Sequence, residues 1–204
     1  MATATRQRKM TAEKFLKWAL RPENAARNLE LDAGEVVEVP SPIREHAYYC
    51  WVVIRILTEY VTKRGIGYLL TNDCGILVER DPDTVRGADV MLFLRDVEEK
   101  DFEKKYVEDI PDLIVEVISP SDTAKRINRR VSQYLERGIP LVWLINFENT
   151  TVSVCRPNEF PKVLDETDEL TGNGVLPGFS RKVADLFTLP TKKTARRPRK
   201  GNRE

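Results

Sequence analysis

The chain has 204 residues, a length that suits one domain, and 41% of them are hydrophobic, which excludes a protein that is disordered throughout. The formal net charge is only +1, because 33 Lys and Arg residues are balanced by 32 Asp and Glu residues, so the whole chain is not an obvious nucleic-acid binder. No apolar run approaches the roughly 18 residues of a membrane-spanning helix, and the first ten residues contain no apolar segment typical of a secretory signal. The three cysteines are scattered without a CxxC pair, which is typical of small buried side chains in a reducing compartment, and we expect a cytoplasmic protein.

The charge is distributed unevenly along the chain. Residues 191–204 hold seven basic residues and one acid, a charge of +6, which leaves residues 1–190 with −5. Such a basic segment is typical of a tail that contacts nucleic acid, or of one that only keeps the chain soluble. We therefore expect a single domain over residues 10–190, followed by a basic, disordered tail over residues 191–204.

The first half of the domain predicts helices and short strands. A short amphipathic helix is expected over residues 10–18, and residues 28–39 favour a strand or a hairpin arm, which Pro40 and Pro42 end. The longest helical pattern covers residues 45–63, is apolar on most of its faces, and predicts a helix packed in the core. Three short apolar strands are expected at residues 67–71, 75–79 and 89–94. The charged segment at residues 96–107 is expected to be a solvated loop or a short surface helix.

A strand–helix–strand pattern follows. Residues 113–118 are the most strand-like segment of the chain, and residues 141–145 predict a second apolar strand. Between them, residues 123–137 predict a helix for which Ser121 or Asp122 is the expected N-cap. This order predicts two parallel strands joined by a right-handed crossover.

The C-terminal part of the domain adds further strands. Residues 151–155 alternate as an exposed strand does, and residues 160–187 predict a hairpin with a turn at residues 172–174. Taken together, the elements predict an α/β domain with a mixed sheet flanked by helices.

One acid lies inside the most apolar strand. Glu116 has Val115 and Val117 on its two sides, with Ile114 and Ile118 beyond them. Burying a carboxylate without a partner is costly, so such an acid is usually paired, protonated or bound to a metal. Two interpretations stay open from the local sequence: a functional carboxylate, and a structural salt bridge to an arginine of the following helix.

A second acid, Asp89, opens an earlier apolar strand. Alone, an acid at a strand start is often a turn or cap residue. Two strands that each carry one acid can nevertheless bring both carboxylates to one sheet edge, where paired carboxylates are the usual way to hold Mg²⁺. Such an ion makes hydroxide from water at neutral pH and stabilises charge on a phosphate. Asp112, four residues before Glu116, lies too far along the strand to share the ion, and is expected at the strand entry or as a support of the site.

The helix after Glu116 supplies cations. Arg126, Arg130 and Arg137 fall on one flank of its apolar stripe, and Arg130 is nearest to the edge of that stripe. A long arginine there can reach Glu116, Asp89 or a phosphate, and a solvated basic face is the alternative.

The single histidine, His46, lies near the start of the long predicted helix. It is either a satisfied core or cap residue, or a residue that positions water or a phosphate near the metal. One histidine makes a His-rich zinc site or a Ser-His-Asp triad hard to build.

Several stretches of the sequence resemble one known family. They are GEVVEV at 34–39 with Ser41-Pro42 and Glu45-His46 after it, TVRGADV at 84–90, PDLIVEVISPS at 111–121, residues 134–143, and LPGF at 176–179. In order and spacing, from about residue 10 to residue 188, they resemble the Uma2 family of restriction endonuclease-like proteins. The resemblance implies the PD-(D/E)XK nuclease fold and Mg²⁺-dependent hydrolysis of phosphodiester bonds.

Carried over by position, the resemblance implies Asp89 as the first metal-binding acid and Glu116 as the second. The family usually shows Lys on the following helix at the position of Arg130, and Pro at the position of Ala88. Arginine can clamp a phosphate but does not act as a neutral base. Arg130 is therefore expected to stabilise transition-state charge.

The favoured interpretation is a Mg²⁺-dependent DNA endonuclease, with Mn²⁺ as a substitute ion and Asp89, Glu116 and Arg130 as catalytic residues. DNA is the expected partner, and a homodimer is expected because cutting two strands favours two active sites. The alternative interpretation is a nuclease-derived module that binds nucleic acid or a partner without cutting. The reason for this alternative is Arg130 in place of Lys.

Overall fold

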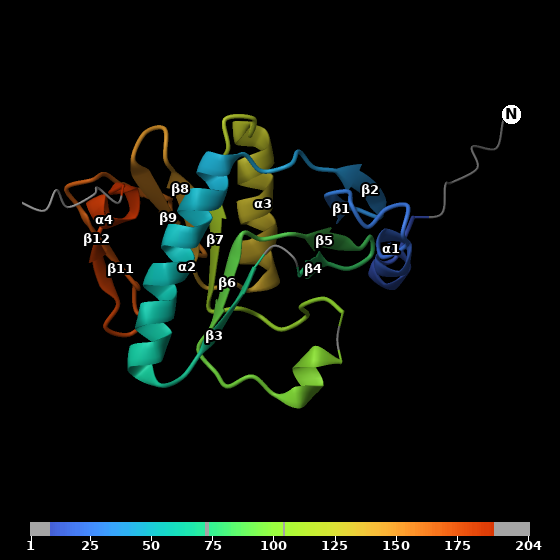
Figure 1. The fold of residues 1–204 in the computed structure, drawn as a ribbon, viewed down its shortest axis with the longest axis horizontal. Coiled ribbons are helices and arrows are strands. Elements are labelled where there is room, and N and C mark those ends of the chain that lie inside the picture. The colour runs from blue at the N-terminus through green and yellow to red at the C-terminus, as the bar shows by residue number, and fades with distance from the viewer. Residues whose placement is uncertain (1–8, 72–73, 104, 190–204) are drawn as a thin grey trace, which may run out of the picture.

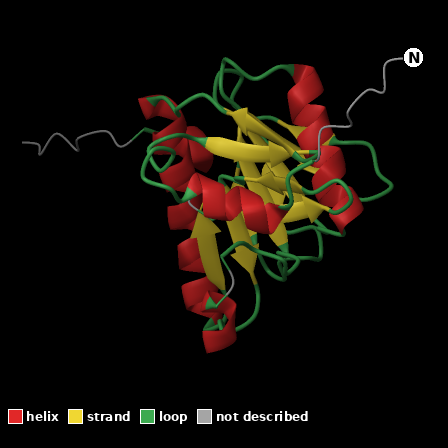
Figure 2. Ribbon diagram, turned by 90° about the vertical axis from the view of Figure 1, so that its right-hand side faces the viewer, coloured by secondary structure: helices red, strands yellow, loops and turns green. Residues whose placement is uncertain are grey.

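The computed structural model describes residues 9–71, 74–103 and 105–189, and the predicted tail over residues 191–204 lies outside them. A mixed six-stranded sheet forms the centre of this part of the chain, with helices on both sides (Figure 1, Figure 2). Among its strands only β7 and β8 run parallel, so the predicted mixed sheet is confirmed for the described residues. In sheet order the strands are β10 (Lys162–Leu164), β9 (Thr151–Cys155), β8 (Val142–Asn146), β7 (Leu113–Val117), β6 (Val90–Phe93) and β3 (Tyr68–Thr71).

Helix α3 (Ala124–Arg137) joins the two parallel strands, which confirms the predicted strand–helix–strand unit. The predicted N-cap is wrong. Thr123, rather than Ser121 or Asp122, caps α3, because its hydroxyl accepts a hydrogen bond from a backbone N–H of the first turn. Asp122 accepts a hydrogen bond from the backbone N–H of Ser119 at 2.9 Å and so fixes the turn before the helix.

The helices α2 (Arg44–Arg64) and α3 cover opposite faces of the central sheet (Figure 1). Successive residues of a strand point to opposite faces, so β7 places Val115 in the apolar cluster under α2 and Ile114 in the cluster under α3. Because both faces are covered, β7 reads in the sequence as a nearly continuous apolar run. An acid in that run is therefore forced into a packed environment.

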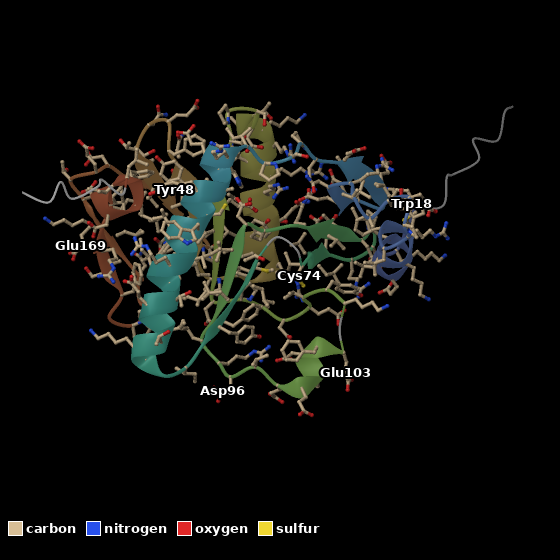
Figure 3. The ribbon with its side chains drawn as sticks, in the orientation of Figure 1. Trp18, Tyr48, Cys74, Asp96, Glu103 and Glu169 are labelled. Carbon is tan, nitrogen blue, oxygen red and sulfur yellow. The ribbon has the colours of Figure 1, made fainter. Side chains whose placement is uncertain are left out.

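The prediction that α2 is apolar on most faces is wrong at its outer side. Leu57 and Val61 face the sheet and are buried, whereas Trp51 is 51% exposed. The Trp51 ring lies against Tyr48, which Figure 3 labels on the same helix, and under the guanidinium of Arg55. The helix is thus amphipathic, with its aromatic outer side open to solvent.

A second sheet, of four strands, lies beside the first (Figure 1). Its strands, in order, are β2 (Glu35–Glu38), β1 (Leu29–Asp32), β5 (Thr84–Arg86) and β4 (Ile76–Glu79), and helix α1 (Ala12–Ala19) packs against it. Residues 28–39, predicted to be a strand or a hairpin arm, instead form both strands of a hairpin, β1 and β2, which turns at Ala33 and Gly34, both with positive φ. The short strand β5 was not predicted; the chain passes from it through residues 87–89 directly into β6, so the second sheet is tied to the start of that strand.

The remaining elements are small. They are η1 (Glu99–Phe102) in the charged segment, β11 (Glu169–Thr171), β12 (Ser180–Lys182) and α4 (Ala184–Phe187). The predicted turn at 172–174 lies in the connection of the β11–β12 hairpin. The interpretation of residues 151–155 as an exposed strand is wrong on one face, because Val152 and Val154 are buried. Among the described residues, no helix combines the length and apolar character that crossing a lipid bilayer requires.

The two sides of α2 give a direct stability test. We expect Leu57→Ala, at a fully buried position, to lower the free energy of unfolding by about 2–5 kcal/mol through lost burial and a cavity. On the same helix, Trp51→Ala is expected to cost less than about 1 kcal/mol, because that ring is half exposed. Urea unfolding followed by circular dichroism measures both, and equal losses would contradict a one-sided helix.

Candidate active site

Glu116 lies in β7 with its side chain 13% exposed. The crossover from β7 into α3 places Arg130 and Tyr134, one helical turn apart, next to Glu116, and both contact the same carboxylate oxygen. Oε1 of Glu116 accepts hydrogen bonds from Nη1 of Arg130 at 3.0 Å and from the hydroxyl of Tyr134. The salt bridge to an arginine of the following helix, left open by the sequence, is therefore present. Within the described residues, Oε2 receives no hydrogen bond and stays available to a ligand.

Asp89 lies opposite Glu116 across the strand pair. The antiparallel register pairs Val90 with Val115, which places the preceding Asp89 level with Glu116. Its Oδ2 accepts a hydrogen bond from the backbone N–H of Val117 at 2.7 Å, and the residue is only 8% exposed. The structure thus brings together the two acids that the sequence singled out, Asp89 immediately before β6 and Glu116 within β7.

His46 lies in the first turn of α2 and is buried against Asp89. Its Nε2 is 3.2 Å from Oδ2 of Asp89, and its Nδ1 is 3.5 Å from Sγ of Cys50, one helical turn further on. Burial by itself lowers the pKa of His46, but the hydrogen bond and charge of Asp89, together with the charges of Glu116 and Asp122, outweigh it and raise the pKa above its usual value. Burial raises the pKa of the Cys50 thiol far above its usual range, and the charges of Asp89 and Glu116 raise it further.

A third acid, Glu30 on β1, was not predicted. It is 3% exposed; its Oε1 accepts hydrogen bonds from the N–H of Gly87 at 3.0 Å and from Nη2 of Arg130. Its Oε2 pairs with Nη1 of Arg86 at 3.2 Å. The signal that could have revealed Glu30 is the one that revealed Glu116, an acid between two large apolar residues of a strand.

The other predicted arginines and Asp112 have different positions. Arg137 donates to the backbone carbonyls of Leu77 and Glu108, so its role is structural. Arg126 lies 3.8 Å from Asp122 at the cleft described below. Asp112 accepts a hydrogen bond from the N–H of Leu94 at 2.7 Å, which confirms it as a strand-entry residue at the far end of β7.

The charged groups of the site shift one another's pKa values. Burial raises the pKa of Glu116 to about 7; the charge of Arg130 opposes this rise and the charge of Asp89 adds to it. Burial alone would lower the pKa of Arg130, but the charges of Glu116, Tyr134 and Glu30, with the hydrogen bond to Glu116, together outweigh it and raise the pKa, so the guanidinium stays cationic. A perturbed acid beside a second acid in a cleft is typical of a functional site.

These groups line one cleft of about 560 Å³. Its polar wall contains Glu30, His46, Asp89, Glu116 and Arg130. It is also lined by residues of α1, by the start of β1 and by residues 39–42, which follow β2. The acids therefore lie where a ligand from solvent can reach them.

The donor atoms of Asp89 and Glu116 fit a hard divalent cation. Oδ1 of Asp89 and Oε2 of Glu116 are carboxylate oxygens that receive no hydrogen bond from the part of the chain that the structure describes. Oxygen ligands from one or two carboxylates, completed by water, are what Mg²⁺ prefers. Among the described residues, one set of three metal-binding residue types also gathers closely: His46, Cys50 and Asp89.

Comparisons with known proteins identify the family of the chain and its fold. The model of the Uma2 family, described as "Putative restriction endonuclease", matches residues 12–185. A solved structure described as a putative nuclease belonging to DUF820 from Anabaena variabilis ATCC 29413 aligns with a TM-score of 0.71 and 20% identity. The alignment covers 87% of this chain and 97% of that one, and at this identity it establishes the fold. No curated protein matches the sequence.

Glu30 gives a test of the buried charge network. We expect Glu30→Ala to lower the free energy of unfolding by about 3–5 kcal/mol, because it leaves Arg86 and Arg130 buried with one counter-charge fewer. Glu38→Ala, in the neighbouring strand, breaks an exposed ion pair with Arg27 and is expected to leave the urea midpoint unchanged. Similar midpoints for the two variants would contradict the buried network.

Proposed function

The chain belongs to the Uma2 family of putative restriction endonucleases, and from this premise we propose that it is a Mg²⁺-dependent endonuclease that hydrolyses phosphodiester bonds of DNA. The family and the shared fold support a nuclease. The observation that carries the finer proposal is the position of Asp89, just before β6, level with Glu116 of β7, each with a carboxylate oxygen available at the cleft. A cytoplasmic location, and a homodimer that presents two sites to two strands, belong to the same proposal.

In this proposal Asp89 and Glu116 hold the ion. When bound, Mg²⁺ lowers the pKa of a water ligand and compensates charge on the phosphate. The protein fixes both ligands in advance: the Val117 N–H and His46 orient Asp89, and Tyr134 orients Glu116. Such supporting contacts keep carboxylate ligands in place and tune their affinity for the ion.

Arg130 supplies the fixed positive charge of the proposed site. It is bound on one side by Glu116 and on the other by Glu30, so its head is held at the cleft without freedom to swing away. A guanidinium in this position neutralises charge that develops on the phosphate. It does not take up a proton during the reaction, because arginine stays protonated in proteins.

The two acids give the principal activity test. With supercoiled plasmid and Mg²⁺, we expect Asp89→Asn and Glu116→Gln each to lower the nicking rate by more than about 100-fold, since even groups that only support metal ligands contribute about 10–100-fold. The matched control is Glu166→Gln, an exposed acid in the turn after β10, which is expected to nick as wild type does. Wild type and Glu116→Gln that nick equally would refute the enzyme proposal.

The alternative, a nucleic-acid or partner-binding module that does not cut, is tested at Arg130. The main proposal expects wild type to cleave and Arg130→Met to lose about 10²–10³-fold, the usual contribution of one group that stabilises transition-state charge. Circular dichroism checks that the variant folds. Cleavage by Arg130→Lys together with none by wild type would contradict the main proposal and support the module, because Lys is the residue usual in the family.

The basic segment over residues 191–204 is proposed to add affinity for the DNA backbone. Deleting it is expected to weaken DNA binding and to reduce the slope of log K against log salt concentration, because fewer counterions are released from the phosphates. Fluorescence anisotropy with a labelled duplex at several salt concentrations measures both quantities. Unchanged affinity and slope would identify the segment as a solubilising end.

A further inference from the structure

A second set of metal-binding atoms lies beside the two paired acids. His46 Nδ1 is 3.5 Å from Sγ of Cys50, and His46 Nε2 is 3.2 Å from Oδ2 of Asp89. One donor atom from each of the three residues lies within 4.8 Å of the other two. Nitrogen, sulfur and oxygen donors in this combination are typical of Zn²⁺ and are not a Mg²⁺ set.

Rigid elements position these three residues. His46 and Cys50 are four residues apart on α2, so they lie on the same face of the helix, one turn from each other. Asp89 enters from the start of β6, with Oδ2 fixed by the Val117 N–H. His46 and Asp89 line the cleft, so an ion and its remaining ligand can arrive from solvent.

The charges around Asp89 also favour a cation there. In the described part of the chain, Arg130 pairs with Glu116 and Glu30, whereas the ion-pair partner of Asp89 is His46. In this part of the chain Asp89 is therefore a buried carboxylate whose ion-pair partner is an imidazole and not a guanidinium or ammonium, so a metal cation can supply its counter-charge. A Zn²⁺ ion with one thiolate, one carboxylate and one neutral imidazole forms a site of zero net charge.

We propose that His46, Cys50 and Asp89 form a Zn²⁺ site that shares Asp89 with the Mg²⁺ pair. The metal–sulfur bond forms as the Cys50 thiol releases its proton to solvent, and no electron transfer is involved. The fourth position, open to the cleft, is taken by water. A consequence, which rests on the proposed nuclease function, is that Zn²⁺ withdraws Asp89 from Mg²⁺ and inhibits cleavage.

The site itself is tested without DNA and without Mg²⁺, so its outcome is independent of nuclease activity. The untagged full chain, kept reduced by a phosphine and freed of metal, is titrated with Co²⁺ and then with Zn²⁺. We expect one equivalent of Co²⁺ to give thiolate-to-cobalt absorption in the near ultraviolet, and Zn²⁺ to abolish it. No such absorption in wild type would overturn the proposal.

Two cysteine variants identify the ligand. Cys50→Ser is expected to lose the absorption and to weaken Zn²⁺ binding by more than about 100-fold. Cys74→Ser, at the comparably half-buried cysteine that Figure 3 labels just before β4, is expected to keep both. Loss of the absorption in Cys74→Ser, or its retention in Cys50→Ser, would overturn the assignment.

Wild-type protein provides a further readout should Cys50→Ser fail to fold. His46 is the only histidine of the chain, so its ring ¹⁵N signals are unambiguous. Equimolar Zn²⁺ is expected to shift the signal of one ring nitrogen strongly, whereas excess Mg²⁺ is not, and unshifted signals with Zn²⁺ would overturn the site.

The competition for Asp89 is tested by plasmid nicking. Micromolar Zn²⁺ is expected to inhibit nicking by wild type and Cys74→Ser but not by Cys50→Ser; equal inhibition of all three would refute the competition alone.

Discussion

The buried ion pairs of Arg130 are the interaction on which the site depends. Its guanidinium lies between Glu116 of β7 and Glu30 of β1. All three side chains are buried: Arg130 and Glu116 are each 13% exposed to solvent, and Glu30 is 4% exposed. Removing any one of them leaves an uncompensated charge in a packed region, which costs more than the pair gains in stability. The arrangement thus couples the central sheet, the second sheet and α3.

The segment that connects the two sheets places Asp89 beside this cluster of buried charges. Strand β5 pairs with β1 and then passes through Gly87 into Asp89 and β6. Gly87 donates its N–H to Glu30 and its carbonyl accepts from Arg130, so the same short segment supports the cluster and presents Asp89 beside it. Asp89 and Glu116 are then level across a strand pair, where their charges act on each other.

The sequence predicted residues of the site best where a charged residue interrupts or borders a local apolar pattern. Glu116 was recognisable because an acid interrupts an apolar run, and Arg130 because a helical projection placed it at the edge of an apolar stripe. Glu30 obeys the same rule as Glu116, but its strand alternates imperfectly and its partners, Arg86 and Arg130, are 56 and 100 residues away. Such distant pairings are set by tertiary packing, which cannot be seen from a short stretch of sequence.

Other features were missed for the same reason. Cys50 was interpreted as a core side chain, which agrees with its partial burial, yet the docking of α2 on the sheet brings its sulfur to His46. Periodicity located α2 but not which side faces solvent, because Trp51 is apolar and exposed. Propensity located the start of α3 to within one or two residues, but the choice among Ser121, Asp122 and Thr123 depends on the turn that Asp122 closes.

The most direct test of the account is a crystal structure of the protein soaked in Mn²⁺, with the ion located by its anomalous scattering. The account predicts one ion bound by carboxylate oxygens of both Asp89 and Glu116, with Arg130 still against Glu116 and Glu30. An ion held by only one of the two acids, or an anomalous peak elsewhere with none in this cleft, would contradict it.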